Sequence, residues 1–192
     1  MFSIVLTGFG KMKTSAMEKL KYPIGDFVKP RETGMKQIEG WIGEIEAFPA
    51  DLIAVTGELD RERLNWIYRP GGWTVKQVVH HCADSHMNSY IRFKLALTEE
   101  SPQIRPYFED RWALLPDSLD DDIGDTLRLL ESLHRKWAAL LRSLREDDFK
   151  RVFVHPEHGQ VVSLAENTAI YAWHGKHHLA HIRQALRYKG RF

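Results

Sequence analysis

The chain has 192 residues, enough for one domain with a sizeable core, and its 27 Lys and Arg nearly balance its 26 Asp and Glu. A near-neutral charge excludes the basic surface typical of a nucleic-acid-binding protein, and no apolar run is long enough for a membrane span. The one cysteine, Cys82, has no internal disulfide partner, which favours a cytoplasmic location.

Residues 1–21 are expected to be an N-terminal extension, disordered or translated from an over-extended start, with a single domain over 22–192. The apolar patch from Phe2 to Phe9 lacks the basic flank and cleavage site of a signal peptide. A Pro- and Gly-punctuated arm then extends to Gly34. We therefore expect the regular structure to begin after this arm.

Two helices are expected before the middle of the chain. Apolar residues recur at three- and four-residue spacing from Ile38 to Ile53, which predicts a long helix with a kink at Pro49. The turn "YRPGGW" leads into Thr74 and Gln77, which have capping-box spacing at a helix start. This second helix is expected to end near Leu97.

Residues 98–122 hold three prolines and many charges and predict a long crossover loop. A third helix is expected over 125–145, followed by a hairpin in which "RVFV" and "QVV" flank "HPEHG". "SLAE", from Ser163, is a second capping box that opens the last helix, and Gly190 is its expected C-terminal cap. These elements predict an all-α four-helix bundle with a long crossover loop and a small β-hairpin before the last helix.

Four histidines fall within eight residues of the last helix, in "WHGKHHLAHIRQ". At about 100° per residue, they share one face at the edge of the apolar stripe. They form two interleaved pairs at i, i+4 spacing: His174 with His178, and His177 with His181. Two histidines at this spacing can bind one cation, and helical geometry leaves open which pair does so.

A third ligand is needed, and the second helix supplies "VVHHCADSH". His81 lies at the edge of its inward face and is the best-placed partner for the histidines of the last helix. His86 points into the core and is expected to be a hydrogen-bonded core residue, whereas His80 is expected to be solvated. Surface or turn positions are expected for His134, His155 and His158.

The sequence resembles the DinB-like superfamily of metal-binding four-helix bundles, and closely its YfiT branch. The resemblance runs from about Tyr22 to the C-terminus and is carried by "YPIG", "GGWTVKQVVHHCADSHMNSYIRFKLALTEE", "IRPY" and "WHGKHHLAHI". It implies one divalent ion, zinc or nickel, held by His81, His177 and His181. Cys82 departs from the family's usual Leu and is interpreted as a small buried hydrophobe.

Three imidazoles leave open positions on an ion, as in catalytic sites. Such an ion can activate water for hydrolysis or a thiol for transfer to an electrophile. The resemblance admits both: its YfiT branch bears the name of metal-dependent hydrolases, and relatives conjugate low-molecular-weight thiols such as bacillithiol. We favour the S-transferase, because no carboxylate is placed beside the three ligands by the sequence; a metal-binding module without turnover is the third hypothesis.

A small-molecule substrate is expected, and the resemblance implies a homodimer. The residues expected around the ion or the substrate come from the second helix, the crossover loop and the last helix. They are Asp84, Ser85, Arg92, Arg105, Tyr107, Trp112, His174 and His178. The crossover segment "IRPYFEDRW" is expected to fold over the site as a lid, with its two aromatic residues lining the pocket.

Overall fold

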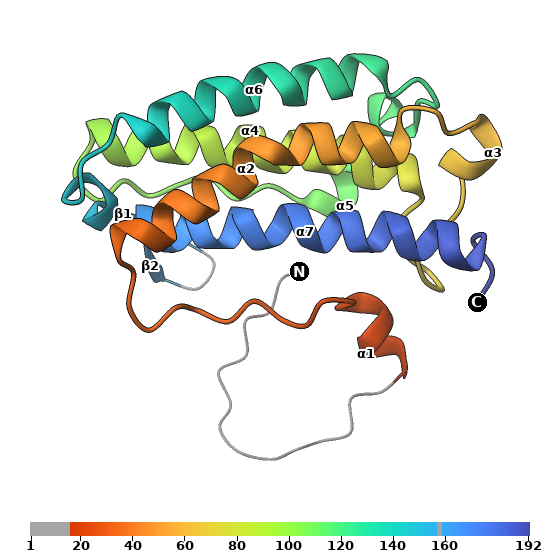
Figure 1. The fold of residues 1–192 in the computed structure, drawn as a ribbon, viewed down its shortest axis with the longest axis horizontal. Coiled ribbons are helices and arrows are strands. Elements are labelled where there is room, and N and C mark those ends of the chain that lie inside the picture. The colour runs from red at the N-terminus through yellow and green to blue at the C-terminus, as the bar shows by residue number, and fades with distance from the viewer. Residues whose placement is uncertain (1–15, 157–158) are drawn as a thin grey trace.

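The computed structural model describes residues 16–156 and 159–192, and four long helices dominate it (Figure 1). They are α2 (Met35–Thr56), α4 (Val75–Thr98), α6 (Gly124–Arg142) and α7 (Leu164–Tyr188). The predicted four-helix bundle is confirmed, with each long helix within a few residues of its expected range. α2 continues through Pro49 as one helix.

The long helices do not pack in simple chain order. α2 lies against α6 and α7, and α4 lies against the same two helices, so that α2 and α4 are diagonal to each other. The core between them is apolar and aromatic at one end, where the rings of Phe93 and Trp137 meet edge to face at 5.6 Å. A second apolar cluster, which includes Leu52, Val78 and Ile182, fills the other end, and the buried histidines lie between the two clusters.

The connections contain short helical turns. These are α3 (Arg61–Leu64), α5 (Glu109–Trp112), η1 (Pro116–Leu119) and η2 (Asp148–Lys150). The crossover between α4 and α6 therefore contains a turn of α-helix and a turn of 3-10 helix. The side-chain amide of Gln77, in the first turn of α4, donates to the carbonyl of Ala113 at 2.7 Å and holds the crossover against α4.

The predicted hairpin is present as β1 (Val152–His155) and β2 (Gln160–Ser163), paired antiparallel with Val152 opposite Ser163. The crossover adds to its edge, because Gln103 forms a parallel bridge with Val154. Two backbone hydrogen bonds, from Ile104 N to Val154 O and from Val154 N to Pro102 O, make this contact. The hairpin thus fixes the start of the crossover at one end of the bundle.

The predicted capping boxes form to different extents. At α4 the Thr74 hydroxyl accepts from the Gln77 N–H, and the Gln77 side chain accepts from the Thr74 N–H. At α7 the Ser163 hydroxyl accepts from the Glu166 N–H at 3.1 Å. The Glu166 carboxylate does not complete that box and instead pairs with Lys29 at 2.7 Å, because the N-terminal arm lies alongside α7.

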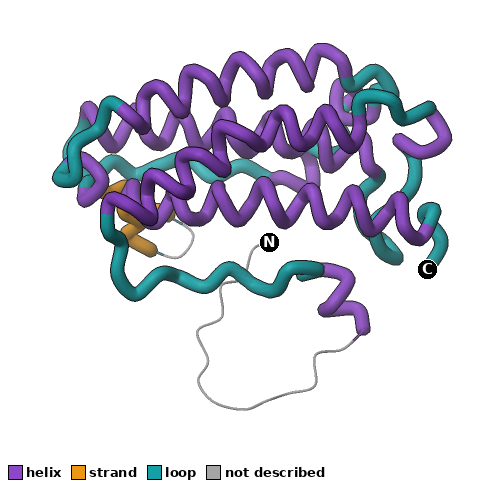
Figure 2. Tube along the Cα trace, in the orientation of Figure 1, coloured by secondary structure: helices purple, strands orange, loops and turns teal. Residues whose placement is uncertain are grey.

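The arm connects α1 (Ala16–Lys21) to the start of α2 and extends beside α7 (Figure 2). The side chain of Gln184 donates to the carbonyl of Leu20 at 2.9 Å, and His181 donates through Nε2 to the carbonyl of Lys21 at 2.8 Å. Of the predicted N-terminal extension, residues 1–15 lie outside the described residues. The remainder forms α1, whose last carbonyls contact α7.

Among residues 16–156 and 159–192, no helix has both the length and the apolar character that a bilayer span requires.

Candidate metal centre

The four histidines of α7 are all buried: His174, His177, His178 and His181 expose at most 6% of their surface. A helix face of this kind forms because the neighbouring positions Leu179, Ile182 and Ala185 are apolar and pack into the core. Burying four imidazoles side by side is costly unless their ring nitrogens have partners. The partners of each nitrogen therefore indicate what the cluster does.

His81 of α4 meets the first of the two interleaved pairs. One ring nitrogen each from His81, His174 and His178 lies within 4.8 Å of the other two. The ring centroid of His81 is 5.4 Å from that of His174 and 4.8 Å from that of His178. Three imidazoles from two helices therefore converge on one point, as the sequence predicts for His81 with an i, i+4 pair.

The second pair lies toward the N-terminal arm. His177 stacks on Trp173 at 4.4 Å and lies 5.8 Å from the ring of Tyr22. His181 stacks on Tyr68 at 3.9 Å, and its Nε2 is bonded to the arm at Lys21. The expected ligand set of His81, His177 and His181 stays a prediction. The structure brings His174 and His178, which were expected to line the pocket, together with His81.

A row of imidazoles extends from His174 into the core. His174 Nδ1 is 3.0 Å from His86 Nε2, and His86 Nδ1 is 2.7 Å from His134 Nε2. His134 Nδ1 ends the row, 2.5 Å from the carbonyl oxygen of Ile45 in α2. His86 is thus the hydrogen-bonded core residue that its position predicts. His134 was expected at the surface, and that prediction is wrong, because its ring is 1% exposed and bridges two helices.

Burial keeps these imidazoles neutral. Burial lowers the pKa of His81 to about 4, although the charge of Glu109 opposes the shift. Burial likewise lowers the pKa of His134 to about 4, and of His174 and His178 well below the usual value. The neutral form is the one that offers a ring nitrogen to a metal ion.

The donor set fits a divalent ion. His81 Nε2 and His178 Nε2 are buried without a hydrogen-bond partner among the described residues, which is costly for a polar atom inside a protein. Within the described part of the chain, the hydrogen bonding of His174 Nε2 is limited to a long contact of 3.5 Å to the Ser85 hydroxyl. Three neutral imidazoles with available nitrogens are a ligand set that zinc, nickel and similar ions accept.

Hydroxyl groups lie beside the three histidines. The Tyr171 hydroxyl donates to the Ser85 carbonyl at 3.0 Å and lies 3.1 Å from the Ser85 hydroxyl. Tyr107, from the crossover, is also near these groups, and burial raises the pKa of its phenol. The crossover therefore lies over α4 next to His81, and Trp112 packs on Tyr107 at 4.7 Å.

Two carboxyl groups act on residues of this region: Glu109 acts on His81, and Asp84 acts on Tyr107. The charge of the Glu109 carboxylate opposes the lowering of the His81 pKa that burial causes. Asp84 is half-buried on α4, and burial, with the charge of Asp117 adding to it, raises its pKa to about 6. Glu109 was not among the residues expected at the site; its place in the crossover gave no periodic signal, and only folding brings it near His81.

The remaining cysteine and histidine predictions concern burial, and they have different outcomes. Cys82 is fully buried and burial raises the pKa of its thiol, which confirms it as a small core residue. His80 was expected to be solvated, and this prediction is wrong. It is 7% exposed, lies 2.7 Å from the Thr126 hydroxyl and donates through Nε2 to the Asp120 carbonyl. His155 is half-buried in β1, and His158 lies outside the described residues.

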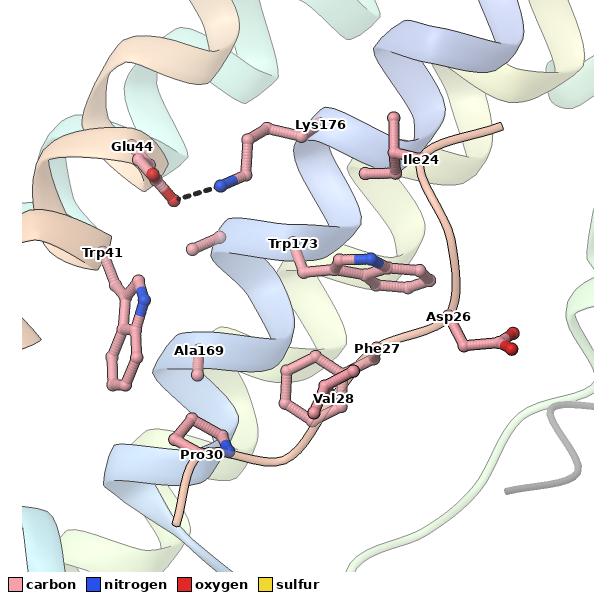
Figure 3. A pocket seen from close by; sticks show the side chains of 11 residues that line it. Ile24, Asp26, Phe27, Val28, Pro30, Trp41, Glu44, Ala169, Trp173 and Lys176 are labelled. Atoms are coloured by element: carbon pink, nitrogen blue, oxygen red, sulfur yellow. Dashed lines mark ion pairs between the residues drawn. The ribbon is translucent and has the colours of Figure 1, made fainter. Parts of the chain in front are cut away.

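A hollow lies outside the histidine cluster, where the N-terminal arm crosses α2 and α7 (Figure 3). Its volume is about 260 Å³, and its walls include Phe27, Trp41 and Trp173. The ion pair between Glu44 and Lys176, 2.9 Å long, spans its α2 and α7 sides. Trp173 is shared, since its ring forms a wall of the hollow and also stacks on His177.

Comparison with known proteins places this architecture in a family. Residues 44–182 match the model of the DinB superfamily. A relative from Bacillus cereus strain 03BB102, named "Putative metal-dependent hydrolase", is 53% identical over 167 residues, covering 86% of this chain and 95% of the relative. A similarly named protein of Bacillus licheniformis is 50% identical over 167 residues, covering 87% of this chain and 95% of the relative.

A solved structure is also similar. It is described as "YfiT from Bacillus subtilis is a probable metal-dependent hydrolase with an unusual four-helix bundle topology". It aligns with a TM-score of 0.87 and 47% identity, covering 90% of this chain and 98% of that one. The resemblance seen in the sequence is confirmed, and the chain belongs to the DinB superfamily, in the branch that contains YfiT.

Proposed function

We propose that this chain is a metal-dependent enzyme in which His81, His174 and His178 hold one divalent ion that activates a nucleophile toward a small-molecule substrate. One observation carries the proposal: a ring nitrogen from each of the three histidines lies within 4.8 Å of the others. Two of these rings have a buried Nε2 without a hydrogen-bond partner among the described residues. The names of the relatives support the metal dependence.

The choice of the pair on α7 follows from hydrogen bonding. Both ring nitrogens of His181 have neighbours: Nε2 donates to the Lys21 carbonyl, and Nδ1 is 3.4 Å from His178 Nδ1. A carbonyl only accepts, so Nε2 of His181 carries the proton, and in the neutral ring Nδ1 accepts from His178 Nδ1–H. That leaves His178 Nε2 unprotonated and free to bind an ion.

An ion with open positions supplies Lewis-acid activation, lowering the pKa of water or of a thiol. Zinc and nickel both accept imidazole, and the histidines do not discriminate between them. The contribution of the chain is to hold the three imidazoles neutral and to surround them with the Ser85, Tyr107 and Tyr171 hydroxyls. These groups can orient a polar substrate by hydrogen bonds.

We take a low-molecular-weight thiol of the bacillithiol type as the first candidate nucleophile. Arg92 lies eleven residues after His81, on the same face of α4 and about 16 Å along the helix. Within the described residues, neither Arg92 nor Arg105 has an ion pair. Two guanidinium groups without an ion pair in the described part of the chain, one on the same helix as His81 and one on the crossover, favour a substrate that carries carboxylates.

Water is the second candidate, and it would make the chain a hydrolase. Glu109 and Asp84 supply the carboxylates that general-base catalysis requires, and a pKa of about 6 for Asp84 suits a proton acceptor near neutral pH. The relatives are named for this activity. Thiol transfer and hydrolysis therefore differ in whether turnover needs an added thiol.

The experiment compares the two reactions on the same protein. Metal-free protein is reloaded with zinc or nickel and assayed with monochlorobimane plus bacillithiol, which report conjugation, and with p-nitrophenyl acetate alone, which reports hydrolysis. We expect metal-dependent conjugation, lost in His81→Ala and kept in His80→Ala, because His80 bonds to Thr126 and Asp120 away from the cluster.

Each outcome has one meaning. Ester cleavage that needs metal and no thiol would replace the transferase with the hydrolase. Metal binding without either reaction on these probes and a wider ester and electrophile panel would leave a metal-binding module. Failure of the wild type to bind zinc or nickel would refute the proposal. Assembly as a homodimer and a cytoplasmic location remain predictions, and light scattering measures the first of them.

A further inference from the structure

We infer that His86 and His134 are positioning residues that fix the proton of His174 on Nδ1 and so leave its Nε2 free to bind the ion. The row of contacts from the Ile45 carbonyl through His134 and His86 to His174 carries this inference. It rests on the proposed function, because the role of His174 as a ligand gives the fixed proton its purpose.

The row begins at a backbone carbonyl that lacks its usual helical partner. In an α-helix the carbonyl of Ile45 would accept from the N–H four residues later, but that residue is Pro49, which has no N–H. His134 Nδ1 lies 2.5 Å from this carbonyl oxygen. The proline in α2 therefore leaves an acceptor inside the bundle, and the α6 histidine supplies its donor.

The first step fixes the proton of His134. A carbonyl oxygen can only accept, so the proton of this contact is on His134 Nδ1. A neutral imidazole carries one proton, so His134 Nε2 is then an acceptor. His86 Nδ1, at 2.7 Å, must therefore donate to it. The backbone carbonyl has fixed the protonation of two rings.

The proton position on His86 in turn fixes the proton position on His174 at the metal centre. With its proton on Nδ1, the neutral His86 ring accepts at Nε2, and His174 Nδ1 donates to it across 3.0 Å. His174 Nε2 is then unprotonated, on the side of the ring that lies 3.5 Å from the Ser85 hydroxyl. A metal-binding histidine commonly donates its other N–H to a neighbouring acceptor, which sets the tautomer and the ring orientation. Here that acceptor is another imidazole.

The surroundings enforce neutral rings. His86 and His134 are each 1% exposed, and Phe48 lies 5.0 Å and 5.5 Å from them, respectively. The hydrogen-bond partners that the structure gives these two rings are imidazoles and a carbonyl, with no carboxylate to stabilise a cation. An unpaired buried charge is costly, so each imidazole in the row is neutral and carries a single proton.

His134 offers a clean test, because it contacts neither His81 nor His178 in the recorded bonds and reaches His174 only through His86. In His134→Phe the ring shape is retained while the acceptor for His86 is removed. In His134→Gln the side-chain carbonyl can still accept from His86 Nδ1–H, so this variant should restore the wild-type behaviour. His80→Phe is the matched control for loss of a buried histidine elsewhere.

Two measurements are made on each protein. Long-range ¹H–¹⁵N correlation on ¹⁵N-histidine, metal-free protein reports which ring nitrogen of His174 carries the proton. Competition with a chromophoric chelator reports zinc affinity. We expect His174 protonated on Nδ1 in the wild type, a mixture of tautomers in His134→Phe, and a zinc affinity lower by about tenfold or more in that variant. His134→Gln and His80→Phe should stay within about threefold of wild type.

The outcomes separate this inference from the proposed function. A wild type that binds zinc but carries the His174 proton on Nε2 would overturn the positioning role alone. So would a His134→Phe protein that folds, keeps a single His174 tautomer and binds zinc as tightly as wild type. A wild type that binds no zinc would refute the proposed function, and the positioning role with it. If His134→Phe fails to fold, the wild-type tautomer and the His134→Gln affinity still decide the question.

Discussion

The two histidine pairs of α7 have the same spacing and nearly the same burial, yet their surroundings differ. His174 and His178 lie toward α4, where His81 joins them. His177 and His181 lie toward the N-terminal arm, where they meet Tyr22 and the Lys21 carbonyl. What distinguishes the pairs is what faces them: His81 of α4 joins the first pair, whereas the Lys21 carbonyl occupies Nε2 of His181 in the second.

This difference shows that an i, i+4 pair of histidines is only half of a metal site. Each pair offers two imidazoles on one helix face, but a ligand needs an unprotonated nitrogen directed at the ion. The Lys21 carbonyl accepts a hydrogen bond from Nε2 of His181. The Ile45 carbonyl reaches His174 only through the rings of His134 and His86, so Nε2 of His174 stays available. The proposed site therefore depends on hydrogen bonds outside the cluster as much as on the three ligands.

The strongest test of the comparison is metal affinity in four single variants. We expect His81→Ala and His178→Ala to lose at least about 100-fold in zinc affinity, because two imidazoles bind an ion weakly. His177→Ala and His80→Ala should stay within about threefold. Chelator competition on tag-free protein measures all four. If His177→Ala lost the ion while His178→Ala retained it, the metal-binding pair would be His177 and His181.

Acid should lower the free energy of unfolding of the metal-free protein, because burial lowers the pKa of all four α7 histidines. The pKa falls to about 3 for His177 and to about 4 for His181. Their folded pKa values lie below the unfolded value of 6.5, so the unfolded state binds more protons as the pH falls. Stability is then fully present above about pH 6.5 and is lost toward about pH 4, at about 1.4 kcal/mol per pH unit for each histidine. Urea unfolding of metal-free protein across this range measures the slope. A flat profile would contradict the neutral buried cluster.

Gly175 directly follows His174 in α7 and lets this helix approach α2. An added Cβ there would be 2.8 Å from Phe48 Cδ2, inside contact distance. We expect Gly175→Ala to lower the free energy of unfolding by about 1–3 kcal/mol through overpacking. Gly43→Ala is the matched control, since its Cβ meets nothing within 4 Å, and it should be neutral or stabilising by up to about 1 kcal/mol. Denaturant unfolding of both variants tests this, and equal effects would contradict it.

The smallest expected effect concerns the arm that covers the second pair. The Lys29–Glu166 ion pair has an exposed lysine, so Lys29→Ala should cost less than about 0.5 kcal/mol. Gln184→Leu removes the donors to the Leu20 and Tyr68 carbonyls and should cost about 1 kcal/mol or more. Thermal unfolding at low salt ranks the two. The reverse order would mean that charge, and not the backbone contacts, holds the arm.

Most of the fold was predictable, because helical periodicity, capping residues and turn residues are local signals. Thr74 with Gln77 marks the start of α4, and "HPEHG" marks the hairpin turn. The failure at Glu166 is instructive: its capping spacing is correct, but Lys29 of the arm takes its carboxylate. A long-range partner thus replaced a local one, which no local pattern can reveal.

The site was predictable only in part, because its details depend on contacts between distant segments. His81 was predicted from its helix face, and the structure brings it together with an i, i+4 pair. The core position of His86 was predicted in the same way and is confirmed. His134 was assigned to the surface, since its partner at Ile45 lies 89 residues away in the chain. The proline at position 49 was a possible signal, because it leaves one carbonyl without its helical donor.

The diagonal placement of α2 and α4 also affects how the chain folds. In an up-and-down bundle each helix packs on the next one in sequence, so local contacts form early. Here α2 packs on α6 and α7, which begin 68 or more residues after the end of α2, at Gly124 and Leu164. During synthesis the apolar face of α2 therefore stays uncovered until most of the chain has left the ribosome. We expect slower folding than in a bundle with neighbouring pairs, and a transient exposure of this face on which chaperones can act.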